Sequence, residues 1–210
     1  MNASVKACLF TMIAALLLSA CASVGQPSKK IDYYTLEYDP PLQANEREKV
    51  PFTLKISRFQ VSPLYNSNKI IYRDKPFSRN EYYYRKWRAN PGDTITYFLK
   101  RDLQQSSLFK AVFSHEDKFA SEYLLEGAVD EFFEQDNPDS WEAVLSITIA
   151  LIKENEPDVS KRVIFQKTYR ARAPCRQKNP KSLSEAMSLA MAQVSEQVIR
   201  DIVNALKTVR

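Results

Sequence analysis

The chain has 210 residues, of which 44% are hydrophobic and 26% are charged, so it has the composition of an ordinary globular protein of one or two small domains. It contains only three glycines and a single histidine, His115, which excludes glycine-rich phosphate-binding loops and multi-histidine metal sites. The three cysteines, Cys8, Cys21 and Cys175, are too few and too scattered for paired zinc ligands or a disulfide framework. P-loop ATPases, dinucleotide enzymes and zinc hydrolases are therefore excluded.

The first 20 residues have the pattern of a secretory signal peptide. Lys6 gives a short positive region, and residues 8–20 are uncharged and apolar but too short for a membrane-spanning helix, which needs about 20 residues. The stretch ends in Leu18-Ser19-Ala20-Cys21, which resembles the bacterial lipoprotein box. That resemblance implies cleavage between Ala20 and Cys21, with a diacylglyceryl thioether and an N-acyl chain (a palmitate-type lipid) on Cys21. The alternative is an ordinary signal peptide with a cysteine near its cleavage site.

The residues after Cys21 indicate where the anchor is inserted. Ala22 stands where an aspartate retains such lipoproteins at the inner membrane of enteric-type bacteria, so the resemblance implies the inner leaflet of the outer membrane, facing the periplasm. We interpret residues 21–30 as the lipidated cysteine and a flexible tether, which reaches roughly 30 Å when extended. Residues 31–210 form a single predicted domain. Processing removes Lys6 alone among the charged side chains and leaves a net charge of +4, a mild basic excess for which nucleic acid is not the expected partner in the periplasm.

Hydrophobic periodicity predicts a sheet and two helices. Alternating patterns predict strands over residues 31–38, 52–56, 69–73, 81–88, 123–133, 141–153 and 161–171, the last three as an antiparallel meander. Asn90-Pro91 predicts the start of one helix, and Ser106-Ser107 its end. Ser182-Leu183-Ser184-Glu185 predicts a capping box before a long amphipathic helix, which we interpret as packing on the sheet rather than lying on a membrane. The expected fold is α+β: a mainly antiparallel sheet with two helices packed on one face.

Residues 31–207 resemble the ABC-type transport auxiliary lipoprotein family. The stretches 104–119 and 154–161 match nothing in the family that we can place. The matching segments occur in family order. They are Tyr33-Tyr34-Thr35-Leu36, Phe59 to Tyr65, Ile70 to Arg73, Glu81 to Tyr84, Trp87 to Pro91, Leu99 and Leu103, Tyr123 to Gly127, and the C-terminal helix.

The resemblance implies a noncatalytic subunit of a system that moves lipid, specifically phospholipid, across the periplasm. Such systems combine an inner-membrane ABC transporter or permease with periplasmic proteins that carry mammalian-cell-entry (MCE) domains. The auxiliary lipoprotein docks on or caps the MCE component at the outer membrane, in some members as a homo-oligomeric ring. It needs no cofactor apart from the acyl lipid on Cys21. The runner-up interpretation is an envelope assembly lipoprotein of a lipopolysaccharide-export or secretion machine.

The segment from Tyr72 to Arg88 is the predicted contact surface because it combines aromatic and basic residues, which are enriched at interface hot spots. The candidate partner-binding residues are Tyr72, Arg73, Tyr84, Arg85, Trp87 and Arg88. Two alternatives stay open. The rings could belong to the core with solvated arginines around them, or Arg73, Arg85 and Arg88 could bind lipid headgroups.

Catalytic residues are not expected. His115 lies beside Glu116 and Asp117, but neighbouring loop residues rarely share one site, and no GxSxG motif is present. Four acidic residues, Glu126, Asp130, Glu131 and Glu134, occur on one predicted strand, where successive side chains alternate faces, so we expect them to be solvated. Cys175 is expected to be an unreactive loop cysteine.

Overall fold

Three long antiparallel strands form one side of the sheet in the computed structural model, which describes residues 30–41 and 49–208. They are β7 (Tyr123–Asp136), β8 (Trp141–Lys153) and β9 (Val163–Pro174), paired in chain order. The predicted meander is therefore confirmed. The last strand begins at Val163 rather than Lys161 because residues Val159–Arg162 form a one-turn helix, α3, whose N-cap is Asp158.

The other edge of β7 pairs with three short strands in succession, all parallel to it. They are β2 (Val50–Ile56), β3 (Gln60–Val61) and β4 (Lys69–Arg73), and β6 (Phe109–Ser114) pairs in parallel with the far side of β2. The α+β prediction is confirmed: the longest pairings of the sheet are antiparallel, and the short strands make it mixed. Alternation along a short strand identifies its buried face and carries no information about the direction of its partner.

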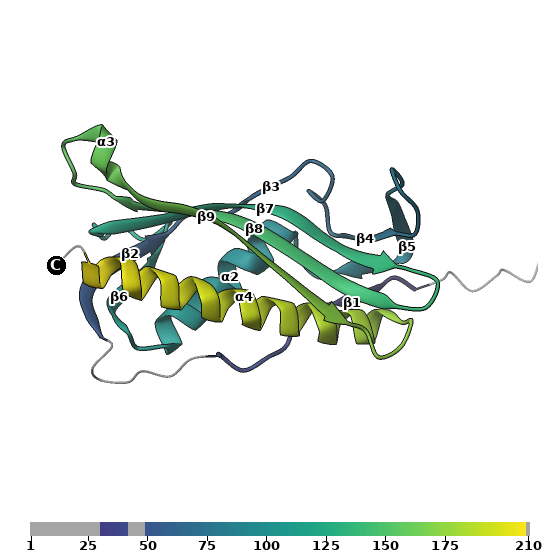
Figure 1. The fold of residues 1–210 in the computed structure, drawn as a ribbon. Coiled ribbons are helices and arrows are strands. Elements are labelled where there is room, and N and C mark those ends of the chain that lie inside the picture. The colour runs from purple at the N-terminus through teal and green to yellow at the C-terminus, as the bar shows by residue number, and fades with distance from the viewer. Residues whose placement is uncertain (1–29, 42–48, 209–210) are drawn as a thin grey trace, which may run out of the picture. The chain divides into compact units, whose positions relative to one another are not determined.

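The edge of the sheet beyond β4 is built from the predicted hairpin and the start of the described chain. The strand β5 (Asn80–Trp87) runs antiparallel to β4, and β1 (Asp32–Tyr34) runs parallel to β5 with Tyr34 opposite Trp87. Figure 1 shows β1 and this hairpin at the same end of the domain as the turn between β7 and β8.

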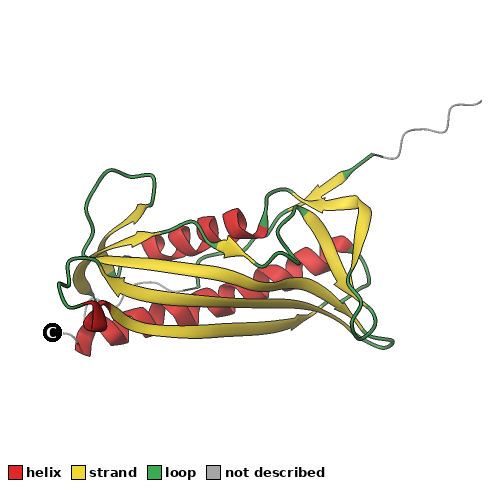
Figure 2. Ribbon diagram, turned by 90° about the horizontal axis from the view of Figure 1, so that it is seen from above, coloured by secondary structure: helices red, strands yellow, loops and turns green. Residues whose placement is uncertain are grey.

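Two helices cover one face of the sheet (Figures 1 and 2). The helix α2 (Pro91–Gln105) has the predicted cap, since the side chain of Asn90 accepts the N–H of Gly92 at 2.9 Å. The helix α4 (Pro180–Thr208) begins before the predicted capping box: Asn179 accepts the N–H of Ser182 at 2.8 Å and is the N-cap. The capping box was therefore wrong. Ser182 lies in the first turn, because Pro180 is well suited to the first helical position.

Residues 35–41 leave the sheet and cross the helices; we call this segment the strap. Leu36 is buried, the N–H of Glu37 donates to the hydroxyl of Ser188 on α4 at 3.0 Å, and the Tyr38 ring stacks on Phe98 of α2 at 5.2 Å. The strand predicted over residues 31–38 therefore ends at Tyr34. Leu36 and Tyr38 continue the alternating apolar pattern but pack against helices instead of a neighbouring strand.

Candidate docking surface and adjoining groove

The predicted contact segment forms the β4–β5 hairpin, and its residues separate into core and surface. Trp87 is 3% exposed and packs edge-to-face on Phe132 of β7, with ring centroids 5.2 Å apart. This side chain belongs to the core, so it cannot contact a partner while the domain is folded. The alternative of core rings with solvated arginines is correct for this residue.

Two further candidates are half-buried at the junction of β4 with β7. Tyr72 packs against Tyr82 with ring centroids 4.7 Å apart. Arg73 accepts a hydrogen bond at its backbone carbonyl from the side chain of Gln135 at 3.0 Å. Both residues fasten the hairpin to the long strand.

The remaining candidates, Tyr84, Arg85 and Arg88, are exposed and lie on or just after β5; we call these three residues the docking surface. The Arg85 guanidinium lies 5.5 Å from the centroid of the Tyr82 ring, and that of Arg88 lies 5.5 Å from the Tyr33 ring on β1. Stacking on aromatic rings holds both cations in place without neutralising them. The surface therefore offers fixed positive charge beside tyrosine rings, which suits an acidic or hydrogen-bonding partner.

A buried carboxylate lies beneath this hairpin. Glu134 of β7 is 4% exposed and accepts a hydrogen bond from the Tyr82 hydroxyl at 3.2 Å. Burial raises the pKa of the Glu134 carboxyl, and the negative charge of Asp136 adds to the shift while Tyr82 opposes it. The sequence-based expectation that Glu134 is solvated was wrong. Phe132 packs on Trp87 and Phe133 on Tyr65, so neighbouring segments cover both faces of β7 at this point.

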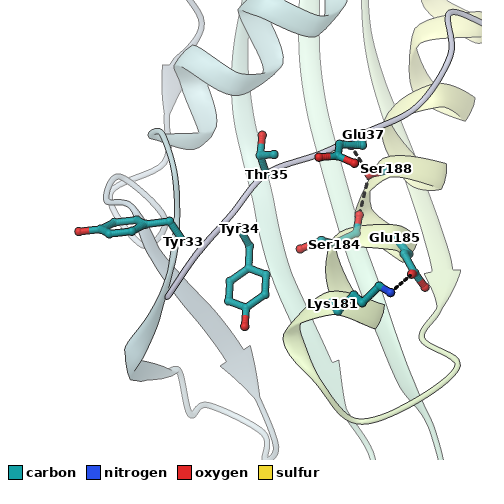
Figure 3. Close-up of a pocket in the computed structure, with 8 residues that line it drawn as sticks. All are labelled: Tyr33, Tyr34, Thr35, Glu37, Lys181, Ser184, Glu185 and Ser188. Atoms are coloured by element: carbon teal, nitrogen blue, oxygen red, sulfur yellow. Dashed lines mark hydrogen bonds and ion pairs between the residues drawn. The ribbon is translucent and has the colours of Figure 1, made fainter. Parts of the chain in front are cut away.

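A groove adjoins the docking surface on the other side of β1, and sequence reasoning missed it. Figure 3 shows Tyr33, Tyr34 and Thr35 on one wall and the first turns of α4 on the other. Its volume is about 260 Å³, slightly below the roughly 300 Å³ at which small-molecule pockets begin. Lys181 and Glu185 lie 4.0 Å apart along its helical wall. The groove depends on where the strap crosses α4, a long-range contact that leaves no local pattern in the sequence.

The residues with the most reactive side chains lie apart from the docking surface and the groove. No cluster of three or more histidine, cysteine or acidic side chains there could hold a metal ion. Cys175 is half-buried, and burial raises the pKa of its thiol to about 11, which keeps it protonated and weakly nucleophilic. His115 is exposed and lies 4.0 Å from Glu116. The predicted lipidation site Cys21 and the cleavage position at Ala20 lie outside the described residues.

The family model of the ABC-type transport auxiliary lipoprotein component matches residues 34–199, which include the hairpin, most of the groove and all of the long strands. The chain belongs to this family. The resemblance noted in the sequence is thereby confirmed at the family level. No curated protein matches the chain.

Solved structures share the fold of this auxiliary lipoprotein. The Xanthomonas campestris protein XCC0632, of the family model DUF330, is 17% identical with a TM-score of 0.74, over 84% of this chain and 97% of that chain. The hypothetical protein CT253 of Chlamydia trachomatis is 9% identical with a TM-score of 0.50, over 75% and 98% of the two chains. At such identities these matches show a common fold and nothing about partners. No helix among the described residues of the auxiliary lipoprotein is long and apolar enough to span a membrane.

Proposed function

We propose that this chain is a noncatalytic lipoprotein subunit of an ABC/MCE-type phospholipid transport system, anchored by Cys21 in the inner leaflet of the outer membrane and docking on the MCE component. One observation carries the proposal: a leader ending in Leu18-Ser19-Ala20-Cys21 precedes a domain that matches the auxiliary lipoprotein family over residues 34–199. An acyl anchor keeps a chain at one membrane, and the family description as an auxiliary component supports a role through contact rather than catalysis.

The docking surface is the proposed contact with the MCE component. Arg85 and Arg88 are exposed basic side chains, and Tyr84 adds an exposed aromatic ring. Buried aromatic and arginine contacts dominate the free energy of binding at many interfaces. The half-buried Tyr72 packs on Tyr82, the ring on which Arg85 stacks, and Arg73 is hydrogen-bonded to Gln135 of β7.

The anchor is tested on the processed protein itself. Mass spectrometry of the mature amino terminus is expected to find Cys21 with its acyl chains, and membrane fractionation is expected to place the protein in the outer membrane. A Cys21→Ser variant is expected to leave that fraction. An unmodified amino terminus, or a wild-type chain in the inner membrane or cytosol, would contradict the proposal.

Docking is tested by co-purification with an MCE-domain protein of the same organism. The double variant Arg85→Glu/Arg88→Glu is expected to lose co-purification, because it reverses both charges of the docking surface. Lys110→Glu, an exposed charge reversal on β6, is the matched control and is expected to retain it. Equal recovery of all three proteins would remove this surface from consideration. A neighbouring barrel or secretion ATPase gene in place of an MCE gene would favour the runner-up system.

A further inference from the structure

The tip of the β4–β5 hairpin holds a phenylalanine in a position that suits glycine. The N–H of Ser78 donates to the carbonyl of Lys75 at 3.3 Å, so Pro76 and Phe77 are the two central residues of a turn. Phe77 has φ of 62°, the left-handed conformation that glycine or asparagine usually occupies after proline in such a turn. Its side chain is fully exposed, at 103%. The ring therefore gains no packing in the described domain that would offset the strained backbone.

This tip lies on the side of the domain where the described chain begins. The strand β1 is parallel to β5, with Asp32 opposite Arg85. Asn80, at the other end of β5, is the residue next to the turn. Figure 1 shows the hairpin and the start of β1 at one end of the sheet. The tether from residue 21 therefore joins the described domain at this end, and its ten residues span at most about 35 Å.

Exposed aromatic side chains gather at the same end. Tyr33 on β1 is 49% exposed and Tyr83 on β5 is 76% exposed, in addition to Phe77 at the tip. Lys75, also exposed, precedes Phe77 in the turn. Aromatic rings with a cation beside them are characteristic of segments that rest in the interfacial region of a bilayer, where the ring enters the headgroup boundary and the ammonium remains among the phosphates.

We propose that Phe77 inserts into the headgroup boundary of the bilayer that holds the Cys21 anchor, with Lys75 among the lipid phosphates. The inference rests on the proposed function, because it needs the acyl anchor to bring this end of the domain to the membrane. A single ring adds little affinity to an acylated protein. Its effect is to orient the domain, with the hairpin tip toward the lipid and α3 at the far end of the sheet away from it. The tip residues differ from the docking surface, so lipid and protein contacts do not compete for the same side chains.

The insertion is tested by fluorescence of the full lipidated chain in vesicles of phosphatidylethanolamine and phosphatidylglycerol with brominated acyl chains. Phe77→Trp keeps an aromatic residue in the turn, and Tyr97→Trp places tryptophan at an exposed position of α2 as the matched control. The wild-type protein gives the background from Trp87 and Trp141. Tryptophan at position 77 is expected to show a blue shift and loss of emission relative to brominated-lipid-free vesicles, and tryptophan at position 97 to show neither.

Vesicle flotation separates failure of this inference from failure of the proposed anchor. A wild-type chain that does not float with vesicles contradicts the anchor. A chain that floats but shows equal emission from positions 77 and 97 overturns the insertion alone. A blue shift at position 77 that needs the MCE-domain protein and occurs without lipid also overturns it, because the tip would then be a protein contact.

Discussion

Phe77 combines a left-handed backbone conformation with a fully exposed side chain, and no contact within the described domain accounts for a phenylalanine at this position. Left-handed backbone costs an L-residue roughly 1–2 kcal/mol, and asparagine tolerates it better than phenylalanine. Since the ring is fully exposed, its removal costs no packing within the described domain. The strain of the Phe77 backbone is therefore not offset by packing of its ring within the described domain, which fits a contact outside it.

We predict that Phe77→Asn raises the free energy of unfolding by about 0.5–1 kcal/mol, because asparagine fits the turn with less strain. The measurement is a urea titration of the two proteins side by side. Tyr83→Asn, a loss of an exposed ring on β5 without a left-handed backbone, is the control and should give no increase. A lower midpoint for Phe77→Asn would show that the ring packs in solution.

Glu134 is predicted to make stability depend on pH. Its pKa is raised in the folded protein, so the folded state binds the proton more tightly than the unfolded state does. Stability contributed by this proton is therefore present below the unfolded pKa, near 4.3, and is lost as the pH rises through the folded pKa. Glu134→Gln removes the titration while an amide oxygen can still accept the Tyr82 hydroxyl. The difference in melting temperature between variant and wild type should increase in favour of the variant from about pH 4 to pH 7. A difference independent of pH would contradict this assignment.

Alanine substitutions of two serines in α4 are predicted to change the stability of the domain in opposite directions. The hydroxyl of Ser195 is buried and has no hydrogen-bond partner within the described chain, whereas that of Ser188 accepts the N–H of Glu37. Ser195→Ala is therefore expected to raise stability by about 1 kcal/mol, and Ser188→Ala to lower it by about 1–2 kcal/mol by leaving a strap N–H unpaired. Calorimetric melting temperatures of the pair provide the test, and the same sign for both would refute it.

At the scale of elements, the strap is joined to α2 by a buried polar contact, in addition to its hydrogen bond with Ser188 of α4. The Tyr38 hydroxyl donates to Asp102 at 2.6 Å, and Arg101 donates to the same carboxylate at 2.7 Å. Asp102 is fully buried on α2. A buried carboxylate needs each of these donors, because water does not reach it.

Tyr38→Phe is predicted to destabilise the domain by about 1–3 kcal/mol, since it removes one donor from the buried Asp102 and keeps the ring that stacks on Phe98. Hydrogen exchange should show faster opening of the strap amides, including that of Glu37, than of the β8 amides. Tyr97→Phe, on the exposed side of α2, is the control and should be neutral. Unchanged exchange in Tyr38→Phe would mean that the other strap contacts, from Leu36, Glu37 and the ring at position 38, hold the strap without the Tyr38 hydroxyl.

The sequence predicted the elements whose cause is local and missed those whose cause is a distant contact. Alternation in residues 141–153 identified β8 to the residue, and Asn90-Pro91 identified the start of α2, because periodicity and capping depend on neighbours along the chain. The parallel pairing of β2, β3 and β4 with β7, the strap over α4 and the burial of Glu134 depend on which segments meet in space. Trp87 is a further example. Tryptophan is common both at interfaces and in cores, and the packing of Trp87 on Phe132, which the sequence does not reveal, places it in the core.

At the scale of the whole molecule, the long strand β9 forms an edge of the sheet. Among the described residues β9 pairs only with β8, so its other side carries free backbone groups along twelve residues. Charged side chains cover this strand: Lys167 contacts Asp201 of α4 at 2.6 Å, and Arg170 and Arg172 pair with Glu131 and Glu142. Such charges discourage pairing with a strand of another molecule.

Lys167→Val is therefore predicted to promote association of the mature chain carrying Cys21→Ser, because valine adds a β-forming apolar residue close to Val163-Ile164-Phe165 on an open edge and removes a charge from it. Lys167→Gln is the matched control, since it also breaks the contact with Asp201 but adds no apolar surface. Static light scattering should show a larger mean mass for Lys167→Val than for either Lys167→Gln or the parent, with the difference growing with concentration. Equal masses for the two variants would contradict the prediction. Loss of the contact with Asp201, and not the apolar side chain at the edge, would then determine whether the chains associate.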